Sequence, residues 1–264
     1  MLSSSIAAAA ATPGNLAAEN DAWRKERLAR LTGDEGWLTV VGLHWLEPGV
    51  NHIPSAPGLT FTRKDESVLL TADHPVMVNG KPVQKLALKP DDDKITIGSH
   101  TYFVIIRGEK VAIRERDTAS EFRRKFKGLE LYPFQPGYHL EAKWHPYAKP
   151  VTRRITTITN TIDEMVAPGQ AEFVLAGQTY RLEPVIEEDH LFYIFKDRTA
   201  GKTTYGAGRF LTSPMPKDGK VTVDFNQAYN PPCAFTPYAT CPLPLKENQL
   251  PIAIEAGEKA YHLD

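Results

Sequence analysis

Short runs of alternating hydrophobic and polar residues follow one another along most of the chain from residue 37 onward. The runs are rich in Val, Ile, Thr, Tyr and Phe, and they are separated by turn residues such as Asn79-Gly80, Ala176-Gly177 and Asp218-Gly219. This pattern predicts β-strands, and an Asn-Gly pair between two runs predicts a tight hairpin. The connections are too short for a series of helical crossovers, so we expect antiparallel sheets and a mainly β fold class.

One segment near the N-terminus, residues 20–33, has a different pattern. Trp23, Leu28 and Leu31 recur at helical spacing among basic residues, an Asn-Asp pair precedes them and a glycine follows. These features predict one amphipathic helix with a cap at each end. Residues 1–19 are mostly small, and we expect a disordered leader there.

The strand pattern lapses at residues 117–129, which are rich in arginine and lysine. Phe122 and Phe126 are four positions apart, so a single helical turn would dock both rings while the basic groups stay in water. We interpret this segment as a basic connector between two β domains. The N-terminal domain, residues 34–116, is expected to be sandwich-like, and the C-terminal domain, residues 130–264, barrel-like or sandwich-like.

Composition and charge narrow the classes of partner. The chain has 31 Lys and Arg against 32 Asp and Glu, a net charge of -1, so no global field favours nucleic acid or an anionic membrane. No apolar run approaches the roughly 20 residues that span a bilayer. We therefore expect no nucleic-acid partner and no membrane partner, and the sequence predicts no particular oligomeric state.

The eight histidines and two cysteines indicate neither a metal site nor a disulfide scaffold. No two histidines are spaced four residues apart, so no helix face would present a ligand pair, and we expect no metal and no other cofactor. Two cysteines are too few for a disulfide framework, which favours a cytoplasmic location. Export to the periplasm is the alternative, because the alanine-rich residues 1–14 are compatible with a weak signal peptide.

Residues 225–245, here named the strap, differ from the rest of the chain. The strap contains no charged residue, five prolines, both cysteines and four aromatic residues. Prolines exclude it from a central strand, whereas its aromatic residues predict burial. Two interpretations are compatible with each other: the strap closes the core of the second domain, or it forms a preorganised wall of a small-molecule pocket.

Three functional hypotheses follow, because motifs such as G-x-S-x-G, the P-loop and H-E-x-x-H are absent and no reaction is assigned. The first is a small-molecule binding protein whose aromatic residues stack on the ligand while polar residues orient it. Its candidate ligand-binding residues are His44, Trp45, Tyr205, Arg209, Asn226, Tyr229, Asn230 and Tyr238.

The second hypothesis is a hydrolase-like enzyme acting on a small polar substrate. Its catalytic candidates are Cys233 as nucleophile, and Tyr238 and Asp224 as proton carriers. A cysteine nucleophile needs a base or a positive environment to form the thiolate, so a histidine or carboxylate within about 3 Å would support this hypothesis. The third hypothesis is a purely structural or interaction protein that uses the neutral strap as its contact surface.

Several stretches resemble a bacterial family of unknown function, DUF1684. They are GWLTVVGLHWLEPG at 36–49, FKGLELYPF at 126–134, TTYGAGRFL at 203–211 and the long run at 224–258. That family has no established activity, so the resemblance implies no catalytic residue. The stretch LHWLEPGVNHIPSAPG also resembles the opening of a forkhead-associated β-sandwich, but Pro54 stands where an arginine is expected, which disfavours phosphothreonine recognition.

Overall fold

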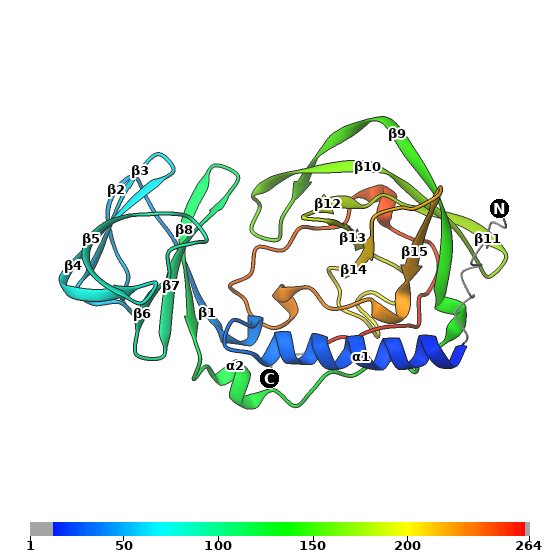
Figure 1. Ribbon diagram of the computed structural model, residues 1–264, viewed down its shortest axis with the longest axis horizontal. Helices are drawn as coiled ribbons and strands as arrows, with labels where there is room; N and C mark the ends of the chain where they lie inside the picture. The colour runs from blue at the N-terminus through cyan, green and yellow to red at the C-terminus, as the bar shows by residue number, and fades with distance from the viewer. Residues whose placement is uncertain (1–12, 262–264) are drawn as a thin grey trace, which may run out of the picture.

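The computed structural model describes residues 13–261, and its strands form two groups beside one long helix, α1 (Pro13–Thr32). Every pairing between its named strands is antiparallel, which confirms the mainly β fold class. Figure 1 shows the two groups side by side, with α1 running along the second one. Within residues 13–261, no helix combines the length and apolar composition that a bilayer crossing requires.

The first group is one curled sheet of eight strands, here called the N-terminal sheet (Figure 1). Its strands are β1 (Val40–Trp45), β2 (Gly49–His52), β3 (Leu59–Lys64), β4 (Ser67–Val78), β5 (Lys81–Leu88), β6 (Ile95–Ile97), β7 (His100–Arg107) and β8 (Lys110–Asp117). Their order is β1-β8-β7-β6-β4-β3-β2, with β5 paired to β4. Asn79 (φ 48°) and Gly80 (φ 76°) turn β4 into β5, which confirms the predicted hairpin.

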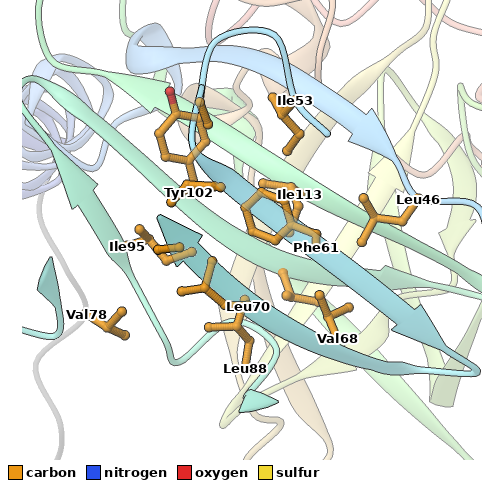
Figure 2. Packing of buried hydrophobic residues seen from close by; sticks show 14 of the residues in the cluster. Leu46, Ile53, Phe61, Val68, Leu70, Val78, Leu88, Ile95, Tyr102 and Ile113 are labelled. Atoms are coloured by element: carbon orange, nitrogen blue, oxygen red, sulfur yellow. The ribbon is translucent and has the colours of Figure 1, made fainter. Parts of the chain in front are cut away.

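The curled sheet encloses its own hydrophobic core. Figure 2 shows Phe61, Leu70, Ile95, Tyr102 and Ile113 converging from five strands into this core. All five side chains are almost completely buried. Along each strand the neighbouring positions point to the opposite face, so the period-two pattern of the sequence is the direct cause of this one-sided core.

The second group consists of two smaller sheets, here called the C-terminal sheets. One has the order β11-β10-β9-β15 and the other β12-β13-β14. Their strands are β9 (His139–Thr156), β10 (Ile162–Leu175), β11 (Gln178–Leu182), β12 (Val185–Glu187), β13 (His190–Phe195), β14 (Arg209–Pro214) and β15 (Lys220–Asp224). Between them, the ring of Phe225 packs edge-on against Phe173 and Phe195, with centroid distances of 5.5 and 5.4 Å.

Helix α1 begins at Pro13, earlier than the boundary at residue 20 that the sequence pattern predicts. Proline is favoured in the first turn of a helix, and Ala17 and Ala18 are strong helix formers, so the described part of the expected leader is helical. Residues 1–12 of that leader lie outside the described residues. Near the helix end, Leu31 is buried against Leu38 and the strap as predicted, whereas Leu28 of the same apolar pattern is 41% exposed.

The basic connector contains the predicted helical turn, α2 (Glu121–Lys125). Its N-cap is Ser120, whose hydroxyl oxygen accepts a hydrogen bond from the Arg123 main-chain N–H at 3.2 Å. Phe122 and Phe126 pack against the cluster that holds Leu38 and Phe235. The two rings are therefore docked as predicted, whereas the division of the chain into separately folding domains stays a prediction.

Candidate functional site

The strap lies outside all named strands and connects the two groups of strands. It contains two single turns, η3 (Phe225–Gln227) and η4 (Pro232–Ala234). The Thr236 hydroxyl donates to the main-chain oxygen of Val40 at 2.8 Å, which ties the strap to the N-terminal sheet. Tyr229 exchanges two main-chain hydrogen bonds of 2.9 Å with Phe210, which ties it to the C-terminal sheets. The predicted burial without strand formation is confirmed.

Asn226 and Asp224 form a turn-stabilising network at the start of the strap. One Asp224 carboxylate oxygen accepts hydrogen bonds from the Asn226 main-chain N–H (3.0 Å) and side-chain amide (2.9 Å). The Asn226 amide also exchanges hydrogen bonds with the Gln135 main chain at 2.9 and 3.0 Å. The second Asp224 oxygen lies 2.9 Å from Nδ1 of His139, so this catalytic candidate is paired with a histidine.

Asn230 belongs to a buried charge network between α1 and the residues that follow the strap, 246–261, here called the C-terminal segment. Glu258 is completely buried, and its carboxylate accepts hydrogen bonds from Arg27 Nε and the Asn230 main-chain N–H, both at 2.8 Å. The Asn230 side chain donates to the main-chain oxygen of Lys259 at 2.7 Å. These contacts hold the helix, the strap and the C-terminal segment together.

Arg209 is a second buried connection to the C-terminal segment. Its guanidinium lies 2.8 Å from a carboxylate oxygen of Asp197, and both side chains are at most 2% exposed. The same guanidinium donates to the main-chain oxygens of Ile254 and Ala256. The structure therefore places Arg209, Asn226 and Asn230 in the interior, where their polar groups are used by the fold.

Cys233 lies in η4 of the strap, and Tyr238 lies in the turn that follows it. The Cys233 main-chain N–H donates to Sγ of Cys241 at 3.1 Å, and the Tyr205 hydroxyl donates to the Cys233 carbonyl at 3.0 Å. Contact with the Cys241 thiol lowers the pKa of Cys233, whereas burial raises the pKa of Cys241. Among residues 13–261, neither Cys233 nor Tyr238 has a hydrogen bond to a histidine or carboxylate, so the structure supplies no base for a nucleophile there.

His44 and Trp45 lie on opposite faces of β1 in the N-terminal sheet, apart from the other candidates. Trp45 packs with Phe103 on the outer face, and the Lys110 ammonium lies 5.4 Å from its ring. His44 points to the inner face, where it contacts Glu115. The structure therefore does not bring these two residues into one pocket with the strap.

Glu115 is the centre of a polar cluster that sequence reasoning missed. Its buried carboxylate accepts hydrogen bonds from His44 Nε2 (2.9 Å), His100 Nδ1 (2.9 Å) and the Ser55 hydroxyl (2.7 Å). Burial by itself raises the pKa of Glu115, but these hydrogen bonds outweigh it and hold the pKa below its ordinary value. Gly42 leaves room for the cluster, because a Cβ there would lie 2.7 Å from both the carboxylate and the His44 ring.

We expect Glu115→Gln to lower the free energy of unfolding at neutral pH by about 1.5–3 kcal/mol, the value of hydrogen bonds to a charged group. A depressed folded-state pKa stabilises the protein above the unfolded value of 4.5, and this contribution is lost as the pH falls through the folded value. Urea unfolding between pH 7 and pH 3 should therefore show that the free energy of unfolding decreases less in the variant than in the parent as the pH is lowered. The exposed Glu121→Gln is the control, and identical acid profiles for parent and Glu115→Gln would contradict the assignment.

A groove of about 1090 Å³ lies between α1, the strands β12–β14 and the strap. Its aromatic lining comprises Trp23, Trp37, Phe192, Phe210 and Tyr229. Its acidic residues are Glu26, Glu35, Glu187, Glu188 and Asp189. Among the candidate ligand-binding residues that the sequence suggested, Tyr229 lines this groove, and its ring lies edge-on to Phe210 with centroids 5.9 Å apart.

The positive charges of the groove are already paired. Arg27 is bound to Glu258, and Arg30 lies 3.5 Å from Glu26 within α1. His190 lies within 3.5 Å of the Glu187 and Asp189 carboxylates. The groove therefore combines aromatic walls with an excess of negative charge. Trp23 belongs to the predicted amphipathic helix, but no local sequence signal shows that it lines one groove with residues of β13 and β14.

Within residues 13–261, no group of three or more His, Cys, Asp or Glu side chains is placed so that it could hold a metal ion. The lining of the groove includes aromatic and acidic side chains. Its lining can stack on a ligand and attract positive charge.

Comparison with known proteins places the chain in a family. The family model described as "Protein of unknown function (DUF1684)" matches residues 124–259, about half of the chain, including the whole strap. An uncharacterized protein of Haloarcula marismortui, solved by NMR in solution, is 31% identical over 52% of this chain and 78% of its own, with a TM-score of 0.44. No curated protein matches the chain. On the evidence of the family model, this chain belongs to the DUF1684 family.

Proposed function

We propose that this protein binds a small organic cation with an apolar body in the groove between α1, β12–β14 and the strap. The observation that carries the proposal is the combination of five aromatic side chains with five carboxylates in one concave surface. Aromatic faces and carboxylates both attract ammonium and guanidinium groups, and aromatic cages are a common way of binding alkylated ammonium ions. The same aromatic walls would also cover the apolar body of the ligand, and its burial would be favourable.

The charges that line the groove favour a cationic ligand over an anionic one. Arg27, whose guanidinium lies 4.8 Å from the centre of the Tyr229 ring, is neutralised by the fully buried Glu258 at 2.8 Å. In contrast, Glu188 is exposed on the groove and forms no ion pair among the described residues, and Glu35 is exposed there with only longer-range attraction to Arg116 and Lys94. An anionic ligand would meet unpaired carboxylates, whereas a cationic ligand would complete their pairing.

The size of the groove supports a small molecule. Ligand sites commonly enclose about 300–1,000 Å³, and the groove, at about 1090 Å³, is slightly larger than this range. Tyr229 contributes from the strap, so the neutral segment that the sequence singled out forms one wall of the site. Burial raises the pKa of Tyr229, so its phenol stays neutral and acts as an aromatic surface.

Tryptophan fluorescence provides the test, with benzyltrimethylammonium as the probe and its uncharged isostere neopentylbenzene as the comparison. Two of the four tryptophans, Trp23 and Trp37, line the groove. We expect the cation to change the emission and to bind about tenfold more tightly than the neutral analogue, as a cation–π contribution of 0.5–2 kcal/mol predicts. The change should be reduced in Trp23→Phe and Trp37→Phe but retained in Trp144→Phe, which packs in the C-terminal core.

Removal of acidic charge is the second arm of the same test. The double variant Glu187→Gln/Glu188→Gln should weaken binding of the cation about three- to tenfold and leave the neutral analogue unaffected. Glu164→Gln, an exposed acid outside the groove, is the matched control. Equal affinity for the charged and neutral probes, or an unchanged signal in both groove tryptophan variants, would refute the proposal.

A further inference from the structure

Three arginines lie on the outer face of the N-terminal sheet, where the strap passes. Arg114 and Arg116 are two positions apart on β8, and Arg107 projects from the same face of the neighbouring β7. Arg107 Nε donates to the Thr240 hydroxyl oxygen at 3.1 Å, and Arg114 Nη2 approaches the same oxygen at 3.4 Å. Two guanidinium groups from adjacent strands thus converge on one uncharged oxygen of the strap.

No direct ion pair among the described residues neutralises the charge of this arginine cluster. Across residues 13–261, none of the ion pairs includes Arg107, Arg114 or Arg116. Arg114 is 4% exposed, and the Nε atoms of Arg114 and Arg116 are buried without a hydrogen-bond partner. A buried charge without a counter-ion is strongly unfavourable, so the arrangement favours occupation by an anion.

The surrounding groups compensate this charge only through longer-range attraction, which includes that of Glu35 for Arg116. The Arg114 guanidinium lies 5.0 Å from the Trp37 ring, an attraction that does not neutralise its charge. Burial, together with repulsion from Arg107 and Arg116, lowers the pKa of Arg114 to about 10, and the attraction of Asp91 opposes this effect only in part. Asp163 faces Arg107 without a direct ion pair, and its own burial raises its pKa.

We propose that the arginine cluster binds a phosphate-type oxyanion between β7, β8 and the strap, with Arg107 and Arg114 as the primary donors. Guanidinium groups present several N–H donors in one plane, a geometry that suits the oxygens of phosphate. The Thr240 hydroxyl would supply a further donor from the strap. A bound anion would thereby join the N-terminal sheet to the strap. This site uses other donors than the proposed cation groove, although Trp37, whose ring faces Arg114, also lines that groove.

The test measures thermal unfolding and heats of binding at constant ionic strength in chloride, inorganic phosphate and glycerol phosphate. We expect millimolar phosphate to raise the melting temperature of the parent relative to chloride. In Arg114→Met, which retains packing against Trp37 while removing the charge, affinity should fall at least tenfold and the phosphate-dependent shift should disappear. Arg154→Met removes an exposed arginine elsewhere and should behave like the parent.

Each possible result of these measurements either supports or overturns the proposed anion site. A shift with glycerol phosphate but not with inorganic phosphate supports the site and identifies a phosphate ester as its ligand. Equal phosphate dependence in the parent and Arg114→Met would show a general ionic effect and overturn the proposal, as would the absence of any phosphate effect on the parent. If Arg114→Met fails to fold, Arg107→Met, whose side chain is only half-buried, provides the same comparison in a ³¹P NMR titration.

Discussion

Arg209→Met is expected to lower the free energy of unfolding by about 3–5 kcal/mol, because it leaves the Asp197 carboxylate buried without its partner. The Arg209–Asp197 pair is at most 2% exposed, and the guanidinium also holds the main-chain oxygens of Ile254 and Ala256. Loss of the guanidinium therefore removes a counter-ion and detaches the C-terminal segment. Urea unfolding followed by far-UV circular dichroism measures the effect.

The matched control is Arg181→Met, which removes an arginine from an ion pair with Glu172 at the surface. The Arg181 side chain is 56% exposed, so its loss should cost no more than about 1 kcal/mol. If Arg209 instead served to orient a ligand, its replacement would abolish binding and leave the free energy of unfolding nearly unchanged. Comparable stabilities of the parent and Arg209→Met would therefore contradict the structural role inferred from the contacts.

Gly257→Ala should destabilise the protein by more than about 3 kcal/mol, through backbone strain and steric overlap together. Gly257 has a φ of +77°, and a Cβ at this position would lie 2.3 Å from the main-chain oxygen of Ala228 and 2.8 Å from that of Phe225. The strap and the C-terminal segment are packed too closely here for any side chain. Thermal unfolding of purified variants gives the comparison.

Gly219→Ala separates the two causes. Gly219 has a similar φ of +73°, but a Cβ there would meet no atom within 4 Å. Strain alone should cost about 1–2 kcal/mol at this turn. If both alanine variants lose the same stability, steric overlap at Gly257 contributes nothing, and the close packing of the strap against the C-terminal segment is not supported.

These two predictions concern the segment on which both proposed sites depend. The strap provides Tyr229 to the groove and Thr240 to the arginine cluster, so its position determines the shape of both. Glu258, buried beneath Arg27 and Asn230, holds the strap against α1. A loss of stability at Arg209 or Gly257 would thus affect binding indirectly, and binding comparisons require variants whose folded state is intact.

The sequence by itself determined the features that depend on neighbours within a few residues. Period-two alternation specified the strands and the antiparallel fold class. The Asn79-Gly80 pair specified a hairpin, because these residue types tolerate the positive φ that both adopt. The spacing of Phe122 and Phe126 specified one helical turn with both rings on the same side. The composition of the strap likewise predicted a buried segment outside the strands.

Only the tertiary structure decided which polar residues belong to the interior and which aromatic residues meet. Asn226, Asn230 and Arg209 have the composition of a ligand site, yet their partners are main-chain groups and carboxylates brought together by folding. Trp23 lies beside Tyr229, with ring centroids 6.3 Å apart, although most of the chain separates them. Local periodicity encodes which face of an element is apolar, but the identity of the facing element is set by sheet order and long-range packing, which a pattern of near neighbours does not contain.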